Sequence, residues 1–474
     1  MKTMRDEKDS LGTVAVPKYA YYGAQTVRAQ ENFLISGITS HDEYIQSIVV
    51  IKKAAARVNH TLGFLPLKFS QAIETVCDEI RDGKFSDQFI VDVYQAGAGT
   101  SIHMNVNEVI ANRANELLDS PKGSYSPLHP NDHINMAQST NDVIPTAIRI
   151  AVLTILPKLF RILILLEKEF IRKERDFHSI LKPGRTHLQD AVPILLGQEF
   201  SAYGVAIQKD RKRINKSSEK LLAIGIGGTA VGTGINSHPR FHRLMVTELQ
   251  TLTKLPLRSN KNLFESMQNA ADFLELSSSL RILAQTCIRI GNDLRLLSSG
   301  PKAGLSEIRL PEVQPGSSIM PGKVNPSIIE MLTMVCFQVI GMDLSILLAS
   351  QAGQLELNVM YPLIAYNLLE QIRLLTSALT SFQENCLKGI TANPRVCAAA
   401  LSSSHSLATL LTPLFGFDKT AKIVKDSYVK NIPLERILVE EKYMEKVQIN
   451  KIFHPLRITK PNRSSMKEKI YPKK

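Results

Sequence analysis

The feature that most constrains the fold of this 474-residue chain is a long apolar repeat with the period of an α-helix. Apolar residues recur at alternating steps of four and three, at Ile148, Val152, Ile155, Leu159, Ile162, Leu166 and Phe170. These steps place apolar side chains along one face of a helix that packs in a bundle. We predict a core helix and not a membrane span, because Arg149, Lys158 and Arg161 interrupt the segment. Pro157 is expected to bend or divide this helix.

Two further segments, 262–297 and 328 to about 348, carry a similar helical pattern. Clusters rich in Gly and Pro separate the helical segments, at 182–184, 225–236, 300–326 and 390–394. No strong run of alternating strand residues is present, so α/β folds are disfavoured. We predict a mainly α fold with a central bundle of long helices between smaller terminal domains. The expected domains are 1–142, 143–394 and 395–474.

Composition fits this architecture. The chain is 44% hydrophobic but only 6% aromatic and has no Trp, which suits helices built from Leu, Ile and Ala. Its five cysteines are far apart and include no CxxC pair, so neither a disulfide framework nor a zinc site is indicated. The charged N-terminus is not followed by an apolar segment, which argues against a secretory signal. We therefore expect a cytoplasmic protein.

The positive charge is unevenly distributed. The formal net charge is +13, and residues 451–474 hold eight basic residues and one Glu. A basic tail is an alternative site for nucleic acid or an anionic membrane, but this one lacks interleaved aromatic residues and any nucleic-acid motif. We expect a solvated, partly disordered end, with neither a membrane nor a nucleic acid as partner.

One short loop, "GSSIMPGKVNP" at 316–326, concentrates polar and conformationally special residues between helical segments. Its glycines allow unusual backbone angles, while its prolines discourage helix. Lys323 and Asn325 are two positions apart, so a cation and an amide donor can meet one anionic group. The helix expected after Pro326 adds its dipole at the same end. A carboxylate is the ligand that such a loop suits.

The same loop contains two serines, Ser317 and Ser318, which are candidates for a base or a nucleophile. A hydroxyl is a weak acid, so its ionisation requires backbone N–H groups, a lysine and exclusion of water to favour the oxyanion. The alternative is a structural turn of Gly, Ser and Pro residues. Spacing alone leaves both alternatives open.

Three other polar clusters are expected near helix starts. Their polar residues are Ser139, Thr140 and Asn141 in "QSTND", Thr186 in "GRTH", and Thr100 and Ser101 in "GAGTS". Each cluster either caps a helix or contacts a ligand. His187, beside Thr186, is more often structural than catalytic when considered alone. An acid such as Glu330 would orient it in a functional role.

A glycine-rich stretch, "GIGGTAVGTG" at 225–234, contains a G-x-G-x-x-A pattern. A dinucleotide site would require a strand before the first glycine, whereas the preceding residues indicate helix. We predict a tight loop between helices without a cofactor role.

Four segments together resemble the aspartase/fumarase superfamily: "GSSIMPGKVNP", "QSTND", "GRTHLQDAVPILLGQEF" and "HPNDHIN". The resemblance runs from about Leu11 to Thr391 in unbroken order. It implies a three-domain, mostly helical subunit whose long helices assemble four copies into a tetrameric core, with each active site drawn from three subunits. It also implies cleavage of a C–N or C–O bond in a succinyl-type substrate, release of fumarate, and no organic cofactor. Activation by a divalent cation stays open.

Two segments favour the aspartase branch. "DQFIVDVYQAGAGTS" and "AGQLELNVM" are similar to aspartases, where fumarases carry different residues. This implies elimination of ammonia from L-aspartate, with L-aspartate, fumarate and ammonium as ligands. Class II fumarase is the alternative, and a non-catalytic scaffold is a more remote one. His103 is a departure, because aspartases usually have Asn at this position.

The resemblance also implies residue roles. Ser317 corresponds to the general base that removes the C3 proton, giving an aci-carboxylate held by Lys323 and Asn325. Substrate-binding roles fall on Thr100, Ser101, Ser139, Thr140, Asn141, Thr186 and His187. Glu330 is expected to orient His187, and no metal ligand is expected. The segment from His129 to Asp132 matches a second anion site whose function we leave unassigned.

Overall fold

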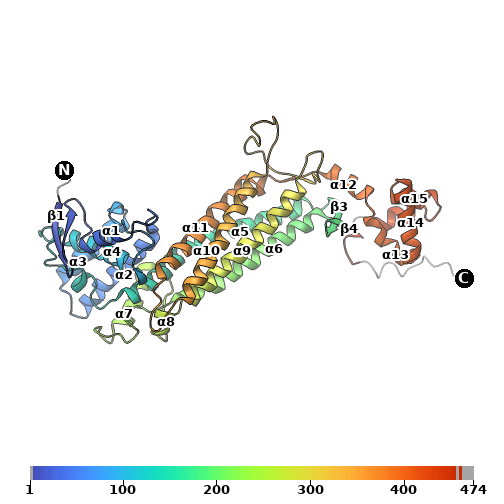
Figure 1. Cartoon of the computed structure of the whole chain (residues 1–474). Coiled ribbons are helices and arrows are strands. Elements are labelled where there is room, and N and C mark those ends of the chain that lie inside the picture. The colour runs from blue at the N-terminus through green and yellow to red at the C-terminus, as the bar shows by residue number, and fades with distance from the viewer. Residues whose placement is uncertain (1–3, 455–457, 462–474) are drawn as a thin grey trace. The chain divides into compact units, whose positions relative to one another are not determined.

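The computed structural model describes residues 4–454 and 458–461, and the chain is mainly helical (Figure 1). The five long helices are α5 (Thr140–Asp176), α6 (Leu196–Ser218), α9 (Ala271–Leu297), α10 (Ser327–Gln351) and α11 (Tyr361–Asn385). The shorter helices are α1 (Ala24–Asn32), α2 (Asp42–Thr61), α3 (Leu67–Arg81), α4 (Thr100–Leu117), α7 (Phe241–Thr253), α8 (Glu265–Gln268), α12 (Pro394–Ser403), α13 (Thr412–Phe415), α14 (Phe417–Lys430), α15 (Leu434–Glu440) and α16 (Lys446–Ile452). Most of the basic tail, at 455–457 and 462–474, lies outside the described residues.

The strands of the described residues are short and form only two-stranded sheets. They are β1 (Met4–Asp9), β2 (Gly12–Pro17), β3 (Leu181–Thr186), β4 (Gln189–Leu195), β5 (Ala223–Ile224), β6 (Arg258–Ser259), β7 (Ile308–Arg309) and β8 (Thr391–Ala392). β5 and β6 pair in parallel, and the other three pairs are antiparallel. The mainly α fold expected from the sequence is confirmed.

Helix α5 confirms the apolar repeat, since all seven residues of the predicted face are buried. Pro157 was expected to bend or divide this helix, and it does not divide it, because α5 runs unbroken from Thr140 to Asp176. A proline inside a helix costs about 3 kcal/mol or more. Burial of a single large aliphatic side chain contributes about 1.5–3 kcal/mol. The apolar face of α5 therefore outweighs the lost backbone bond.

Two boundaries differ from the expected ones. The helix predicted from position 262 starts at Ala271, after the short helix α8. The Asn262 side chain accepts the backbone N–H of Phe264 and Glu265, and Asn269 accepts that of Ala271. These local bonds start new turns where a continuous helix would need its own backbone bonds. The 182–184 cluster lies in strand β3, not in a loop.

The chain divides into two compact units. The first comprises 1–161, 210–285 and 335–377, and the second 162–209, 286–334 and 378–474. Within the first unit, Arg149 of α5 pairs with Asp272 of α9 at 3.0 Å, and Ser277 of α9 bonds Asp343 of α10 at 2.6 Å. The division passes through the long helices, so the three domains expected from the sequence stay a prediction.

The second unit contains its own helix contacts and a small separate core. Tyr203 of α6 donates to Asp293 of α9 at 3.1 Å, and a Cβ at Gly291 would lie 2.9 Å from Ile329 of α10. Toward the C-terminus, buried residues from Leu407 to Ile458 form an apolar cluster that gathers α14, α15 and α16. The helical character expected after position 395 is present.

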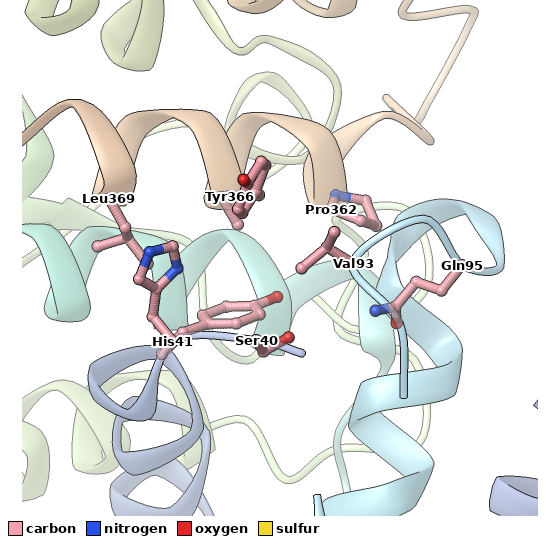
Figure 2. A pocket seen from close by; sticks show the side chains of 9 residues that line it. Ser40, His41, Val93, Gln95, Pro362, Tyr366 and Leu369 are labelled. Carbon is pink, nitrogen blue, oxygen red and sulfur yellow. The ribbon is translucent and has the colours of Figure 1, made fainter. Parts of the chain in front are cut away.

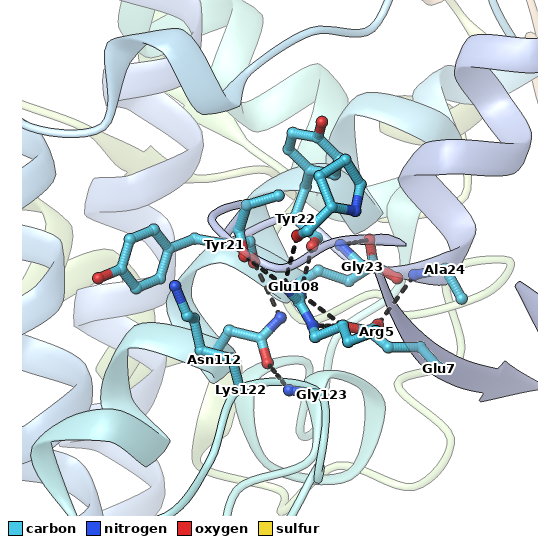
Figure 3. A network of polar contacts seen from close by, with 12 residues as sticks. Arg5, Glu7, Tyr21, Tyr22, Gly23, Ala24, Glu108, Asn112, Lys122 and Gly123 are labelled. Carbon is cyan, nitrogen blue, oxygen red and sulfur yellow. Dashed lines mark hydrogen bonds and ion pairs between the residues drawn. The ribbon is translucent and has the colours of Figure 1, made fainter. Parts of the chain in front are cut away.

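The N-terminal hairpin β1–β2 is anchored by two carboxylates at the start of α1 (Figure 3). Glu108 accepts the backbone N–H groups of residues 23, 25 and 26. Glu7 accepts the N–H of Ala24 and the hydroxyl of Tyr125, the latter at 2.5 Å. Negative charge at a helix N-terminus is favourable because it faces unpaired N–H groups and the helix dipole. Burial raises the pKa of Glu108 to about 7.

Helix α10 is the helix of the described residues that is long and apolar enough to cross a membrane by length and composition. Only 33% of its most apolar window is buried. Four of its exposed apolar residues lie in one stripe, Met334, Phe337, Leu344 and Leu348, and a fifth, Leu347, is exposed beside it. Gly341 lies in the same stripe with open space where a Cβ would stand. Steps of three, four, three and four are the pattern of a helix that packs against other helices.

Candidate active site

The loop 316–326, called the base loop below, is folded around the Ser317 hydroxyl. Ser317 Oγ accepts the backbone N–H of Ile319 at 3.2 Å and that of Met320 at 3.0 Å. Such bonds stabilise an oxygen that becomes negatively charged. Of the three requirements stated from the sequence, Ser317 meets the first, backbone N–H groups directed at a serine oxygen.

The base loop is closed at its two ends and open to solvent between them. Gly316 N–H donates to Lys323 O at 2.8 Å, and Asn325 Nδ2 donates to Gly316 O at 2.5 Å. A Cβ at Gly316 would overlap the backbone of residues 323–325, so only glycine fits there. Lys323 is exposed, and Ile319 at the tip is 83% exposed. Helix α10 starts one residue after Pro326, as predicted.

Thr186 and His187 are placed by the β3–β4 hairpin. Thr186 pairs with Gln189, which leaves His187 and Leu188 as a two-residue turn. Both have positive φ, 56° and 60°, although neither is Gly or Asn. This is the backbone of a type I′ turn, in which side chains other than Gly, Asn and Asp are strained. The alternative that Thr186 caps a helix is wrong, since it ends a strand.

Buried charges anchor the same hairpin. Lys182 pairs with Glu307 at 2.7 Å and with Glu199 at 2.9 Å, and Arg185 pairs with Glu307 at 2.9 Å. Lys182 and Glu307 are almost fully buried. Breaking a buried pair leaves an uncompensated charge, so this cluster fixes the position of β3. Arg185 directly precedes Thr186, and the hairpin tip is thereby carried on a rigid base.

Thr100 and Ser101 begin helix α4, after a strained turn. Ala98 and Gly99 have φ values of 62° and 91°. Ala98 N–H donates to Val359 O at 2.8 Å. The two segments that resemble aspartases, "GAGTS" and "AGQLELNVM", are therefore in direct contact.

Gln95 stabilises the start of α4, because its Oε1 accepts the backbone N–H of Ile102 at 2.8 Å. Figure 2 shows Gln95 beside a small pocket that Val93 shares with Pro362 and Tyr366 of α11. This packing holds the loop that precedes Thr100.

Ser139, Thr140 and Asn141 form the first turn of α5. Ser139 Oγ accepts the N–H of Asn141 at 3.2 Å, which confirms the predicted N-cap. Asn141 Nδ2 also donates to Ala230 O at 2.7 Å. A Cβ at Gly99 would lie 3.1 Å from Ile144 of α5, so the starts of α4 and α5 lie side by side.

The glycine-rich loop (225–234) lies against this turn, a contact that sequence reasoning missed. Asp142 is fully buried and accepts the backbone N–H groups of Ser139, Gly227 and Thr229. Burial raises the pKa of Asp142 to about 6 against the effect of these bonds. Thr229 has φ of 57°, rare for a β-branched residue. The segment is a loop, as expected, and its strained Thr and close glycines were the available signal.

The predicted site residues thus fall into two groups. The Thr100–Ser101 and Ser139–Asn141 clusters come together in the first unit. Thr186, His187, Ser317, Lys323, Asn325 and Glu330 belong to the second unit. Among the described residues, no hydrogen bond or ion pair joins His187 to Glu330 within one chain, so that role stays a prediction.

The described residues contain no group of three or more His, Cys, Asp or Glu side chains that could hold a metal ion. The segment from His129 to Asp132 enters a π-helical turn at Pro130–Ile134. His129 Nδ1 accepts the N–H of Asn131 at 3.1 Å and of Asp132 at 3.4 Å. These bonds use the imidazole to hold the local backbone.

Known lyases are similar to this protein along nearly the whole chain. Residues 12–341 match the family described as Lyase, and residues 407–460 match the one described as Fumarase C C-terminus. The aspartate ammonia-lyase of a Bacillus species is 47% identical, covering 97% of this chain and 98% of its own length. That of Escherichia coli strain K12 is 45% identical, covering 95% and 96%.

Solved structures give the same answer for the fold. A fumarate lyase:delta crystallin from Brucella melitensis, bound to cobalt, has a TM-score of 0.94 at 45% identity and covers 97% of this chain and 100% of its own. The class II fumarase of Schistosoma mansoni has a TM-score of 0.93 at 37% identity, with coverage of 96% and 99%. From the family match, the near-complete coverage of these relatives and the geometry above, this chain belongs to the aspartase/fumarase superfamily of lyases.

Proposed function

We propose that the protein is an aspartate ammonia-lyase, which eliminates ammonia from L-aspartate to give fumarate. The proposal rests mainly on one observation: Ser317 Oγ accepts hydrogen bonds from two backbone N–H groups, in a loop that also contains the exposed Lys323. The similarity to aspartate ammonia-lyases over nearly the full length supports this activity over that of a fumarase. The contact between Ala98 and Val359 supports it further, since both lie in the aspartase-like segments.

In the proposed reaction, Ser317 Oγ removes the C3 proton of L-aspartate as an alkoxide. The electron pair moves into the adjacent carboxylate, which becomes an aci-carboxylate dianion. Lys323 supplies opposite charge, and the N-terminus of α10 adds its dipole. The electron pair then forms the double bond as the C–N bond breaks and ammonia leaves. Thr100, Ser101, Ser139, Thr140 and Asn141 are proposed to bind the substrate together with Thr186 and His187.

We also propose that four copies assemble and that three of them contribute to each site. The exposed apolar stripe on α10, from Met334 to Leu348, supports helix packing between subunits. The site residues also belong to clusters that are separate along the chain. Glu330 would meet His187 of another copy in such an assembly. We further propose a cytoplasmic enzyme that needs no organic cofactor.

The first experiment measures the ultraviolet absorbance of fumarate over time, with purified protein given L-aspartate or L-malate. We expect a rise with L-aspartate only. A rise with L-malate only would make the protein a fumarase. No rise with either substrate would point to another succinyl substrate or to a scaffold without this chemistry.

The second experiment uses Ser317→Ala. Losing a single stabilising group in such a site typically lowers turnover by about 100- to 1000-fold, and losing the base itself is expected to cost at least as much. We expect normal folding and assembly with turnover reduced by at least this factor. Ser318→Ala, in the same loop, is the matched control and should retain far more activity. Near-normal turnover of a folded Ser317→Ala protein would refute the assignment.

A further inference from the structure

A buried row of polar side chains leads from helix α2 to Thr140. Lys52 Nζ lies 2.9 Å from Asn135 Oδ1, 2.9 Å from Gln138 Oε1 and 2.6 Å from His103 Nε2. The other ring nitrogen, His103 Nδ1, lies 2.8 Å from Thr140 Oγ1. Lys52 and His103 are each 1% exposed, so water does not compete for these bonds.

The donors and acceptors in this row determine which atom donates in each of its hydrogen bonds. An ammonium group has three N–H donors, and Lys52 meets three acceptor positions. The amide nitrogens of Asn135 and Gln138 are used elsewhere, on backbone carbonyls, so their oxygens face Lys52. His103 Nε2 must then accept, which places the ring proton on Nδ1. His103 Nδ1–H therefore donates to Thr140 Oγ1.

This direction leaves Thr140 with its hydroxyl proton free to donate. A hydroxyl that donates needs an acceptor, and an ammonium group offers none. Thr140 is half-buried, so the cost of about 1–3 kcal/mol for a donor without an acceptor applies once a bound substrate excludes water from it. A carboxylate oxygen satisfies Thr140, whereas the amine of a substrate does not.

We propose that His103 is a positioning residue that, together with Lys52, holds Thr140 as a hydrogen-bond donor to a carboxylate oxygen of the substrate. The inference rests on the proposed function, because it assigns Thr140 to one end of a dicarboxylate. It also gives a role to the residue that departs from the usual aspartase sequence.

Charges around the row agree with this arrangement. Burial, followed by the charge of Lys52, holds the pKa of His103 well below its usual range, so the imidazole is neutral. Burial lowers the pKa of Lys52 to about 7, while Asp142 on α5 opposes that effect. Cys77 of α3 also faces Lys52, but burial raises its thiol pKa to about 12 and it stays uncharged near neutral pH.

Two further carboxylates near this row have cationic partners of their own. Asp78 of α3 pairs with Lys53, and Glu248 of α7 pairs with Arg57. Below pH 7 Lys52 is charged and the row has the direction given above. Above pH 7 a neutral Lys52 can accept from His103, which then accepts from Thr140. The carboxylate contact should weaken as pH rises through about 7.

The test is a double-mutant cycle on the full-length protein, with the Kd of succinate measured by calorimetry. Succinate is a dicarboxylate without an amine, so binding requires no turnover. Losing one hydrogen bond of about 0.5–1.5 kcal/mol weakens binding roughly 2- to 12-fold. We expect this loss for His103→Ala and for Thr140→Val, and no further loss in the double variant. His103→Asn, which keeps a donor and an acceptor, should restore most of the affinity.

His60→Ala is the matched control, because His60 lies on α2 outside this row and its ring nitrogen bonds the backbone oxygen of Leu65. It should leave the Kd of succinate unchanged. Additive losses from His103→Ala and Thr140→Val, or a wild-type protein that does not bind succinate, would overturn the inference. If His103→Ala does not fold, the cycle is run with His103→Gln. Turnover of L-aspartate by the wild type, measured in parallel, tests the proposed function separately.

Discussion

Ser317 and Asp142 hold their side-chain oxygens in a similar way, since each accepts N–H groups from the backbone. Ser317 Oγ accepts two, and the Asp142 carboxylate accepts three. The two differ in burial. The base loop is open, so Ser317 can meet a substrate, whereas Asp142 is fully buried and serves to join the start of α5 to the glycine-rich loop.

Asp142→Asn is expected to lower both stability and activity. The substitution replaces one carboxylate oxygen, which accepts hydrogen bonds, with an NH2 group, which donates them. This NH2 group faces a backbone N–H group, so a buried donor is left unpaired at a cost of about 1–3 kcal/mol. The thermal midpoint and the KM for L-aspartate should both change. Asp132→Asn, at a carboxylate that is 75% exposed, is the control and should change neither. An unchanged thermal midpoint in Asp142→Asn would show that these three bonds contribute little.

The sequence led to candidate site residues, but it did not reveal most of the contacts between them. Ser317, Lys323 and Asn325 stand close together in the sequence, so a short loop had to bring them together. His103 was noted only as a departure from a pattern. Its contacts with Lys52 and Thr140 span 51 and 37 positions, and no local signal in the sequence fixes such distant contacts.

Among the elements, the β3–β4 hairpin combines a rigid base with a strained tip. Buried ion pairs of Lys182 and Arg185 hold the base, while His187 and Leu188 occupy left-handed backbone conformations. Such strain costs on the order of 1–2 kcal/mol for each residue and persists where the surrounding structure imposes it. The strained turn points to a function for the exposed His187.

Leu188→Gly is expected to raise stability by about 1 kcal/mol. Glycine adopts positive φ without a steric cost, and the Leu188 side chain is 70% exposed, so little packing is lost. Chemical denaturation would measure the change. Val192→Gly in the same hairpin, at a residue without positive φ, should instead lower stability. A loss of stability in Leu188→Gly would mean that the leucine side chain makes a contact that outweighs the strain.

Helices were predicted well and strands poorly, for a physical reason. The face of α5 follows from a repeat that is visible within one segment, and the same holds for α10. Strand β3 contains Pro183 and Gly184, and its burial does not alternate along the strand. A hairpin this short is stabilised by distant partners such as Glu307, which a local pattern does not reveal.

At the scale of the whole molecule, the apolar stripe on α10 is a surface that the proposed tetramer would bury. Phe337→Asp is expected to break the proposed tetramer, because a charge would be buried at each contact. Sedimentation should show smaller species and turnover should fall. Tyr428→Asp on α14, at a side chain that is 77% exposed, is the control and should leave the mass unchanged. An intact tetramer in Phe337→Asp would place the subunit contact elsewhere.

Acid should destabilise the protein partly through Glu370 of α11. Burial opposes its charge, but hydrogen bonds from His41 and Arg373 outweigh that effect and lower its pKa to about 2, from 4.5. Because the folded pKa is the lower one, this contribution is present above pH 4.5 and is lost as pH falls toward 2. Partial exposure to solvent screens these interactions, which reduces the contribution to on the order of 2 kcal/mol.

Glu370→Gln should therefore flatten the fall in thermal midpoint between pH 4.5 and pH 2, while lowering the midpoint near pH 7. Glu384→Gln, in an exposed pair with Lys388, serves as the control and should leave the profile unchanged. A profile of Glu370→Gln identical to that of the wild type would place the acid sensitivity on other carboxylates.

The anchoring of the N-terminal hairpin has a consequence for synthesis on the ribosome. Glu7 and one of its partners, Tyr125, are 118 positions apart in the chain. At about 5–20 residues per second, roughly 6–24 s pass before the hydroxyl of Tyr125 is synthesised. Strand β1 can pair with β2 early, but the Glu7 carboxylate lacks this partner for that time. The segment that carries Glu7 therefore stays open to proteases and chaperones during synthesis for longer than its final, buried position suggests.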